Sequence, residues 1–487
     1  MTEFFSDLSF TTWFTTIVVL LIDFFIRLWV LIYVPKRRKP TAAMAWLLLL
    51  FIVPFVGVIL FLAIGSTKLS RARRKKQEQV TEILHAYTQE LKKQSLLAER
   101  PVPYDAASEL AGALSGLYPT RNNTARIITG YGEIIDDIIA SINSAEKYVY
   151  IEFYILALDV TTEPFFEALK NATQRGVKVY VLFDAWGSKK FPRYKEMQRL
   201  LTDTVTGWHK ILPLTFNPKK YNRPDLRNHR KIVVVDNSVA YIGSLNMIDK
   251  TYHRKDEISY IELAVRLEGP SVNNVATVFA SDWYMESDTV LDDFMKNSLE
   301  AKKGTASIQI VPSGPGYPYP NNLKVFVSLI HTAKKSISIT NPYLVPDESL
   351  LNALISAAQR GVEVSVLNSE AMDQWLVGHA QRSYYGELLE AGIHIYLYKR
   401  PQLVHEKFFS VDDEVAVIGS SNLDIRSFEL NLECTVVGYD VELARTLHTR
   451  HKELLRHSKK LTLAKWQKRN STKNLLDSIA RLTSALQ

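Results

Sequence analysis

The sequence predicts an α/β protein in which two similar α/β lobes form one shared site, preceded by a helical hairpin in a membrane. Three observations predict it: an internal repeat, a strand–helix–strand order in each copy, and two long apolar stretches near the start. The 487 residues are enough for two or three domains. The single cysteine, Cys434, excludes a disulfide framework and a cysteine-based zinc site.

The repeat defines the two lobes. Residues 174–179 read Gln-Arg-Gly-Val-Lys-Val, and residues 359–364 read Gln-Arg-Gly-Val-Glu-Val. A strand-like run precedes each copy, at 148–154 and 336–340, and a helical pattern lies between. A turn-rich stretch joins the copies, so we expect lobe 1 at 106–300 and lobe 2, with a basic C-terminal tail, at 301–487.

Two apolar stretches open the chain, at about 13–34 and 42–64. Each is long enough to cross a hydrocarbon core of about 30 Å, so we expect two transmembrane helices within residues 1–66. Asp23 and Arg27 interrupt the first stretch at a spacing that allows them to pair on one helix face. Residues 67–105 are predicted to form a basic helical linker.

Charge is concentrated at the two ends of the chain. Residues 1–80 hold eleven Lys/Arg and four Asp/Glu, a balance of +7, and residues 451–487 hold nine and two, again +7. The total is +8, so residues 81–450 carry about −6 by subtraction. This distribution indicates contact with anionic membrane lipids and argues against nucleic acid as a partner. The tail is either an amphipathic helix that touches lipid headgroups or a helix packed on the domain with a solvated basic face.

Basic residues flank both ends of the second apolar stretch, so the positive-inside rule discriminates weakly. The larger cluster lies on the side of the big domain, which favours a multi-pass protein of the plasma membrane with a cytoplasmic catalytic domain. A shallow re-entrant hairpin is the alternative, because it would place both clusters on one face.

One motif, His-x-Lys followed after four residues by Asp, occurs twice. It comprises His229, Lys231 and Asp236 in the first copy, and His405, Lys407 and Asp412 in the second. The surrounding residues predict a buried strand, on which His and Lys point to the same side. Chance would produce on the order of 0.03 such matches in this chain, so two copies indicate a binding site for an anion.

A second element follows each motif at the same distance. Gly243 begins Gly-Ser-Leu-Asn fourteen residues after His229, and Gly419 begins Gly-Ser-Ser-Asn fourteen residues after His405. Small residues allow close approach of the backbone to a ligand. We expect hydrogen bonds to phosphate oxygens from four side chains, namely Ser244, Asn246, Ser420 and Asn422.

These groups suit alcohol exchange on a phosphodiester. One neutral imidazole attacks phosphorus and forms a phosphohistidine, while the other, protonated, gives its proton to the leaving alcohol. Two lysines and two asparagines offset the phosphate charge, so the reaction requires neither a metal nor another cofactor.

At these residues the chain resembles the phospholipase D superfamily, whose hallmark is the duplicated HKD motif, over about residues 106–487. The resemblance implies that Asp236 and Asp412 support the fold and that a downstream acidic residue holds each histidine in its working tautomer. Glu433, eleven residues after Asn422, fits that spacing; Glu262, sixteen residues after Asn246, is the candidate for the first lobe. It also implies that His229 is the nucleophile, although the sequence is symmetric on this point.

Over nearly the whole chain, the apolar N-terminus, the paired motifs, and Ser-Gly-Pro at 313–315 ahead of Asn-Pro-Tyr at 341–343 resemble bacterial cardiolipin synthases. The resemblance implies transfer of a phosphatidyl group from one phosphatidylglycerol to another, with release of glycerol. Three alternatives stay open: a phospholipase that hydrolyses the diester or a synthase with another acceptor, a membrane-tethered nuclease, and a non-catalytic lipid-binding protein. Trp186 and Trp375 line either the lipid entrance or the core. The sequence sets no oligomeric state.

Overall fold

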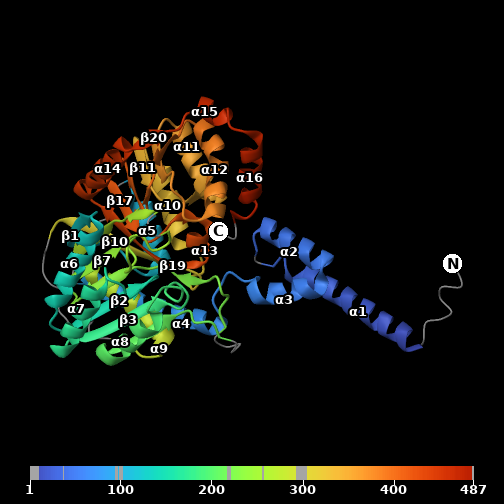
Figure 1. Cartoon of the computed structure of the whole chain (residues 1–487), viewed down its shortest axis with the longest axis horizontal. Helices are drawn as coiled ribbons and strands as arrows, with labels where there is room; N and C mark the ends of the chain where they lie inside the picture. The colour runs from blue at the N-terminus through green and yellow to red at the C-terminus, as the bar shows by residue number, and fades with distance from the viewer. Residues whose placement is uncertain are drawn as a thin grey trace. The chain divides into compact units, whose positions relative to one another are not determined.

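The computed structural model describes residues 10–36, 38–93, 97, 103–215, 221–254, 257–291 and 304–484. The chain divides into two compact units, Met1–Lys68 and Leu69–Gln487 (Figure 1). Each unit is described by itself.

The first unit begins with a helix that is long enough to cross a membrane. Helix α1 (Phe10–Tyr33) contains an apolar span, Thr12–Tyr33, of 22 residues. At 1.5 Å per residue this span is about 33 Å long, which matches a hydrocarbon core of about 30 Å. Among the described residues it is the one helix that meets this criterion.

The prediction of a second transmembrane helix, and hence of a hairpin of two full spans, is wrong. The second apolar stretch forms two short helices, α2 (Pro40–Ile52) and α3 (Pro54–Ile64), which are about 20 and 17 Å long. They are separated at Val53, whose φ of −132° and ψ of 74° are not helical. Pro54 lacks a backbone N–H and its ring clashes with the preceding turn, so it ends α2 and starts α3.

Helices α2 and α3 fold back on each other. A Cβ on Gly57 would lie 3.0 Å from Cδ2 and 3.1 Å from Cα of Leu50, so a larger residue there would require the two helices to shift slightly apart. Further from the break, the rings of Trp46 and Phe61 lie 5.3 Å apart. The start of α2 and the end of α3 therefore lie on the same side, and the turn at Val53 lies at the opposite end of the pair.

The second unit is built around one large sheet to which both lobes contribute. The lobe 1 strands are β1 (Thr120–Ile128), β2 (Tyr148–Phe153), β3 (Lys178–Asp184), β4 (Gly207–Ile211), β6 (Ile232–Val235), β7 (Val239–Gly243) and β9 (Ala264–Glu268). The lobe 2 strands are β10 (Ala306–Ser313), β11 (Ser336–Thr340), β13 (Glu363–Ser369), β14 (His394–Tyr398), β16 (Phe408–Val411), β17 (Val415–Gly419), β19 (Asn431–Tyr439) and the edge strand β20 (Ser458–Lys460).

The two halves of this sheet have the same strand order. From the edge inward, lobe 1 runs β4-β3-β2-β6-β7-β9-β1, and lobe 2 after β20 runs β14-β13-β11-β16-β17-β19-β10. In each lobe the first three strands are parallel and the others pair antiparallel. The antiparallel pair β1–β10 joins the lobes. The α/β prediction and the duplication are thus confirmed, and both lobes contribute to one continuous sheet.

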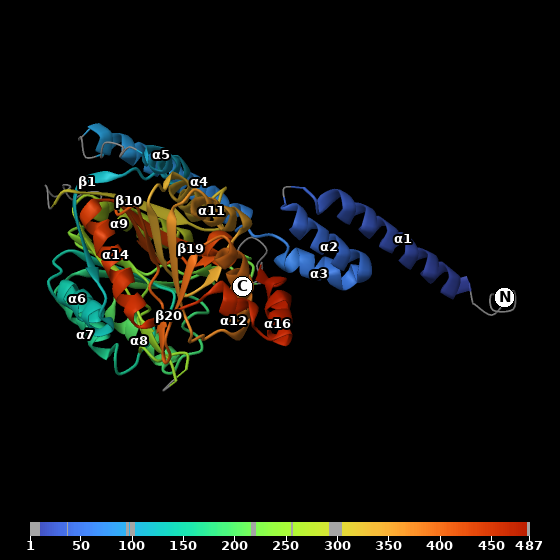
Figure 2. The ribbon, with the colours of Figure 1, turned by 90° about the horizontal axis from the view of Figure 1, so that it is seen from above.

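Corresponding helices cover the two lobes (Figure 2). Lobe 1 carries α6 (Tyr131–Asn143), α7 (Glu163–Gln174), α8 (Tyr194–Thr204) and α9 (Ser271–Ser287). Lobe 2 carries α10 (Asn321–Thr332), α11 (Glu348–Gln359), α12 (Trp375–Glu390) and α14 (Val441–Arg456). The repeated Gly176 and Gly361, with φ of +89° and +87°, follow α7 and α11 in the left-handed conformation that glycine adopts at little cost.

The described residues of this unit form five more helices: α4 (Arg71–Lys93), α5 (Asp105–Ser115), α13 (Ile425–Glu429), α15 (Leu463–Gln467) and α16 (Ser471–Arg481). Helix α5 lies within the predicted lobe 1, yet its Ala107 and Ala111 pack in the core of lobe 2 with Phe326. The predicted join near residue 300 falls outside the described residues, so the lobe and linker boundaries stay a proposal.

Short strands tie one lobe to the other. Strand β5 (Arg227–Asn228) of lobe 1 pairs with β19 of lobe 2, and β15 (Gln402–Val404) of lobe 2 pairs with β8 (Ser259–Ile261) of lobe 1. A further pair, β12 (Leu344–Val345) with β18 (Leu423–Asp424), lies within lobe 2. In each of the two pairs that join the lobes, one strand directly precedes a repeated motif: β5 precedes the first motif and β15 the second. Pairing with the opposite lobe therefore positions both motifs.

Candidate active site

The aspartates of the two motifs shape the turns that follow the motif strands. Asp236 and Asp412 have φ of 50° and 56°, and the next residue in each turn also has positive φ, which gives a tight primed hairpin turn. Each carboxylate accepts three backbone N–H bonds at 2.6–2.9 Å, Asp236 from residues 146–148 and Asp412 from residues 334–336. Both side chains thus fasten the hairpin to the strand beside it.

Each motif histidine is held by a glutamate of the other lobe. Nδ1 of His229 lies 2.9 Å from Oε1 of Glu433, and Nδ1 of His405 lies 2.8 Å from Oε1 of Glu262. The resemblance led us to expect each glutamate beside the histidine of its own lobe, whereas the structure crosses the pairs. An ionised carboxylate accepts a proton from Nδ1, which leaves Nε2 free to face a ligand.

The exchanged strands explain the crossing. The backbone N–H of His229 donates to the carbonyl of Leu432, and that of His405 donates to the carbonyl of Ile261, both at 2.8 Å. Leu432 and Ile261 directly precede the two glutamates in sequence. Backbone pairing between the lobes therefore sets each glutamate beside the histidine of the opposite lobe.

The motif lysines occupy matching positions. Nζ of Lys231 donates to the carbonyl of His229 at 2.6 Å, and Nζ of Lys407 donates to the carbonyl of His405 at 2.7 Å. Burial lowers the pKa of Lys231 to about 7 and that of Lys407 to about 8. Each ammonium is thus poorly solvated and would gain from an anion in the site.

Burial also governs the imidazoles. It lowers the pKa of His229 to about 4 and lowers the pKa of His405, in both cases against the opposing effect of the paired glutamate. Both shifts favour the neutral form of the ring at pH 7. A bound phosphodiester anion would raise both values by favouring the protonated ring.

The glutamates stay ionised. Burial opposes ionisation, but His229 and Lys231 together hold the pKa of Glu433 at about 2. His405 and Lys407 likewise lower the pKa of Glu262 below its usual value. Each carboxylate can therefore keep the Nδ1–H tautomer of its histidine.

These groups form one electrostatic cluster. Lys407 of lobe 2 lowers the pKa of His229 in lobe 1, and Lys231 of lobe 1 lowers the pKa of His405 in lobe 2. The negative charges of Glu262 and Glu433 both act to raise the pKa of Lys407. The structure thus brings the four motif side chains and both glutamates together.

The serines of the second element face the glutamate-bearing strands. The hydroxyl of Ser420 donates to Glu433 and also accepts from the backbone of Cys434. The hydroxyl of Ser244 bonds the backbone of Leu263, next to Glu262. Both serines are completely buried, so these contacts favour support of the glutamates over contact with phosphate.

The asparagines of the second element retain side-chain groups that could contact a ligand. Oδ1 of Asn246 accepts from the backbone of Ile155, and its amide nitrogen lies 3.3 Å from the hydroxyl of Tyr252. Oδ1 of Asn422 is buried and has no hydrogen-bond partner among the described residues. An unsatisfied amide oxygen in such a place is consistent with a donor on a bound ligand.

Sequence reasoning missed two tyrosines beside the histidines. The ring of Tyr154 lies edge-on to His229 at 5.2 Å, and that of Tyr260 lies edge-on to His405 at 5.4 Å. The hydroxyl of Tyr260 donates to Asp373 at 3.0 Å. Tyr154 precedes His229 and Tyr260 precedes His405 at very different separations along the chain. Neither tyrosine therefore belongs to the repeated pattern that identified the other site residues.

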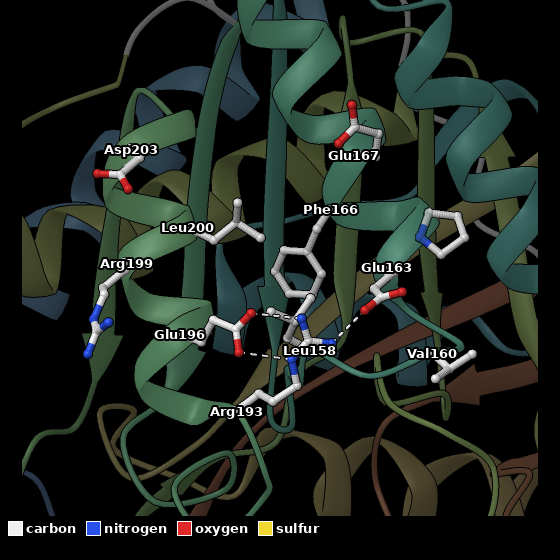
Figure 3. A pocket seen from close by; sticks show the side chains of 11 residues that line it. Leu158, Val160, Glu163, Phe166, Glu167, Arg193, Glu196, Arg199, Leu200 and Asp203 are labelled. Carbon is white, nitrogen blue, oxygen red and sulfur yellow. Dashed lines mark hydrogen bonds and ion pairs between the residues drawn. The ribbon is translucent and has the colours of Figure 1, made fainter.

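Lobe 1 also contains a pocket on its surface (Figure 3). It is lined by α7 and α8, and its Arg193 pairs with Glu163 and Glu196 at 2.5 and 2.8 Å. None of the motif residues lines it. Among the described residues, no three His, Cys, Asp or Glu side chains gather as metal ligands.

Comparison with known proteins agrees with the duplication. Residues 138–283 and 326–455 both match the family described as cardiolipin synthase, PLD-like domain. The chain belongs to this family. Residues 25–66 of this cardiolipin synthase family member also match the phospholipase D-nuclease N-terminal family.

Individual relatives span nearly the whole chain. Cardiolipin synthase A of Proteus mirabilis is 33% identical over 463 residues, which is 92% of this chain and 94% of the relative. Cardiolipin synthase A of Pectobacterium carotovorum is 32% identical, with 93% and 94% covered. The phosphatidylserine synthase of Haemophilus influenzae has a similar fold, with a TM-score of 0.60 at 14% identity, over 78% of this chain and 100% of that one.

Proposed function

We propose that this member of the cardiolipin synthase family is a phosphatidyltransferase that joins two phosphatidylglycerol molecules into cardiolipin and releases glycerol. One observation carries the proposal: two buried histidines, one from each lobe, are held by glutamates of the opposite lobe beside two buried lysines. That arrangement supplies a nucleophile, an acid and two cations to one phosphate.

In the first half-reaction, neutral His229 attacks the phosphorus of a bound phosphatidylglycerol through Nε2. A P–N bond forms as the bond between phosphorus and the glycerol oxygen breaks. His405, protonated when the anionic diester is bound, gives its Nε2 proton to the departing glycerol oxygen. Lys231, Lys407, Asn246 and Asn422 offset the charge on the phosphate oxygens.

In the second half-reaction, His405 takes a proton from a glycerol hydroxyl of the second phosphatidylglycerol. That oxygen attacks phosphorus, the P–N bond breaks, and cardiolipin leaves with His229 regenerated. Water at this stage would give phosphatidic acid, so a dry site favours transfer. Both histidines and both lysines are buried, which supports exclusion of water.

Product analysis tests this function. Purified protein is incubated with phosphatidylglycerol alone, and the products are separated and identified. Equal amounts of cardiolipin and glycerol are expected. Phosphatidic acid as the main product would favour the hydrolytic alternative, and cleavage of DNA without lipid turnover would favour the nuclease.

We also propose a membrane arrangement for the first unit, in which α1 crosses the bilayer and α2–α3 form a re-entrant hairpin. Arg27 of α1 pairs with Asp23 at 2.6 Å and donates to the carbonyl of Phe51 at 3.0 Å. That carbonyl lies at the broken end of α2, where it lacks a helical partner. Inside a membrane, such a group requires a donor from the protein.

In this arrangement, the basic residues before α2 and after α3 lie on one side of the bilayer, where the positive-inside rule places them in the cytoplasm with the catalytic unit. Labelling by a membrane-impermeant maleimide tests it, since Cys434 is buried. Lys39→Cys and Lys68→Cys should react from the same side, and Thr12→Cys from the other. Reaction of the two lysine positions from opposite sides would contradict a re-entrant hairpin.

A further inference from the structure

Helix α16 presents its apolar side chains away from the protein. Leu475, Ile479 and Leu482 are 61%, 52% and 84% exposed. The residues that face inward are Asp477 and Ala480. On an ordinary surface helix the pattern is reversed, as in α14 of the same lobe, where Leu443, Leu447 and Leu454 are buried.

A polar cluster holds α16 in this orientation. The Asp477 carboxylate is buried and lies 2.6 Å from Nδ1 of His379 and 2.5 Å from the guanidinium of Arg469. Arg382 of α12 is a third partner at 3.4 Å. Turning α16 by half a turn would bury its leucines but leave this carboxylate without its partners, which is costly.

Helix α12 extends the exposed apolar surface. Asp477 pairs with His379, and Arg481 pairs with Glu387. Because both pairs follow the same order along the two helices, α16 runs in the same direction as α12 and lies beside it (Figures 1 and 2). Trp375 is 63% exposed, and its ring lies 4.4 Å from that of His379, the partner of Asp477 on α16. Together they form what we call the α12–α16 patch, which comprises Trp375, Leu376, Leu475, Leu476, Ile479 and Leu482.

The charge around the patch is positive. Residues 457–484 contain seven Lys/Arg and one acidic residue, Asp477, whose carboxylate is already bound inside the protein. Lys465, Lys468 and Lys473 are exposed. An outward apolar face beside uncompensated lysines is typical of a helix that lies in the interface of an anionic bilayer.

The patch also adjoins the candidate active site. Trp375 follows Asp373 by two residues, and Asp373 accepts hydrogen bonds from the hydroxyls of Tyr260 and Tyr343 at 3.0 and 2.6 Å. Tyr260 is the ring that lies against His405. Lipid at the patch would therefore lie close in sequence to Asp373, whose partner Tyr260 contacts the motif histidine His405.

We propose that the α12–α16 patch is a second membrane contact, at which the catalytic unit docks its lobe 2 onto the surface of an anionic bilayer. Contact at this face is independent of which phospholipid reaction the site catalyses. An anionic bilayer satisfies both features of the surface, since its acyl chains take the leucines and its headgroups take the lysines.

A nitroxide spin label tests the occupant of the patch in the full-length protein. The label is attached to Ile479→Cys and, as a control, to Glu167→Cys on α7, which lies on the other side of the catalytic unit from α16 (Figures 1 and 2). The native Cys434 is buried and should stay unlabelled. The protein is placed in nanodiscs that contain phosphatidylglycerol, and collisions with oxygen and with a water-soluble nickel chelate are compared.

At position 479 we expect oxygen to relax the label more than the nickel chelate does, and at position 167 we expect the reverse. Greater access of the nickel chelate at 479 would mean that the face lies in water and would overturn the proposal. An immobilised label shielded from both reagents would mean that a protein segment, of this chain or another, covers the face, and would also overturn it.

A variant with Leu475→Ser, Ile479→Ser and Leu482→Ser tests the consequence for activity. The inward contacts of Asp477 and Ala480 are retained, so an unchanged melting temperature should show that the unit still folds. We expect the mole fraction of phosphatidylglycerol needed for half-maximal activity to rise by about threefold or more, with little change at saturation. An unchanged dependence in the folded variant would contradict a docking role.

Discussion

Nδ1 of His229 lies 2.9 Å from Oε1 of Glu433, although the two residues are 204 positions apart in the chain and belong to different lobes. His405 and Glu262 form the reciprocal pair, 143 positions apart. Neither lobe alone contains a histidine with its own carboxylate partner from these four residues. The site is therefore complete only when the two lobes are joined.

Replacing Glu433 with glutamine should lower turnover of phosphatidylglycerol by about a hundredfold. The amide still fits the space and its oxygen can still accept from Nδ1–H, but without a negative charge it stabilises less strongly the Nδ1–H tautomer that leaves Nε2 free to attack. Steady-state rates measure the effect. The control is Glu453→Gln, because Glu453 is half-exposed and pairs with Arg450 at 3.5 Å. Equal rates in the two variants would contradict a positioning role for Glu433.

The motif aspartates should matter more for stability than for chemistry. Asp412→Asn replaces one acceptor oxygen of a carboxylate that binds three backbone N–H groups, and we expect a loss of about 2 kcal/mol, seen as a fall of about 2 °C in the melting temperature of a unit of this size. Asp203→Asn, at an exposed position on α8, is the matched control. If Asp412→Asn melted like the wild type but lost all activity, Asp412 would have a direct role that its contacts do not suggest.

The pH profile of kcat/KM should be bell-shaped. As the pH falls towards about 4, His229 becomes protonated and loses the lone pair that attacks, so activity falls on the acid side. As the pH rises through about 7 to 8, Lys231 and Lys407 lose their protons and attract the phosphate less, so activity falls on the alkaline side. Bound substrate raises the lysine pKa values, and hence the alkaline limb of kcat should lie at higher pH than that of kcat/KM.

Two variants check that assignment. Lys407→Arg keeps its charge at all pH values used and should move the alkaline limb upward if it retains activity, whereas Lys407→Met should lower kcat/KM throughout. An alkaline limb that stays in place in Lys407→Arg would assign it to Lys231 or to another group.

Most of the fold could be predicted from the internal repeat. The duplicated Gln-Arg-Gly-Val segments mark the same helix-to-strand turn in each lobe, and the apolar residues after the motif lysines form β6 and β16 as predicted. The prediction that each motif histidine and lysine lie on that strand is wrong, because both strands begin one residue after the lysine, at Ile232 and Phe408. Local patterns report such elements well because the periodicity of a helix or strand is written in neighbouring residues. The break at Val53 was visible in principle, since Pro54 stands in the middle of an apolar run long enough to span.

The sequence could not show which lobe supplies each glutamate. Spacing along the chain places Glu433 near the second motif, but the partner is decided by the strand pairs β5–β19 and β8–β15, which join distant segments. The outward leucines of α16 were hidden for a similar reason. That helix is amphipathic in sequence, with one apolar face and one polar face. Only the contact of Asp477 with His379 shows that the polar face is the one turned towards the protein.

Trapping the covalent intermediate tests the central claim most directly. Protein turning over phosphatidylglycerol labelled at phosphorus is quenched within milliseconds, digested, and searched for a phosphorylated histidine that is stable to base and labile to acid. Label on His229 is expected in the wild type and absent from His229→Ala, which should also be inactive. Label on His405, or full turnover with no labelled histidine, would contradict a mechanism in which His229 attacks phosphorus.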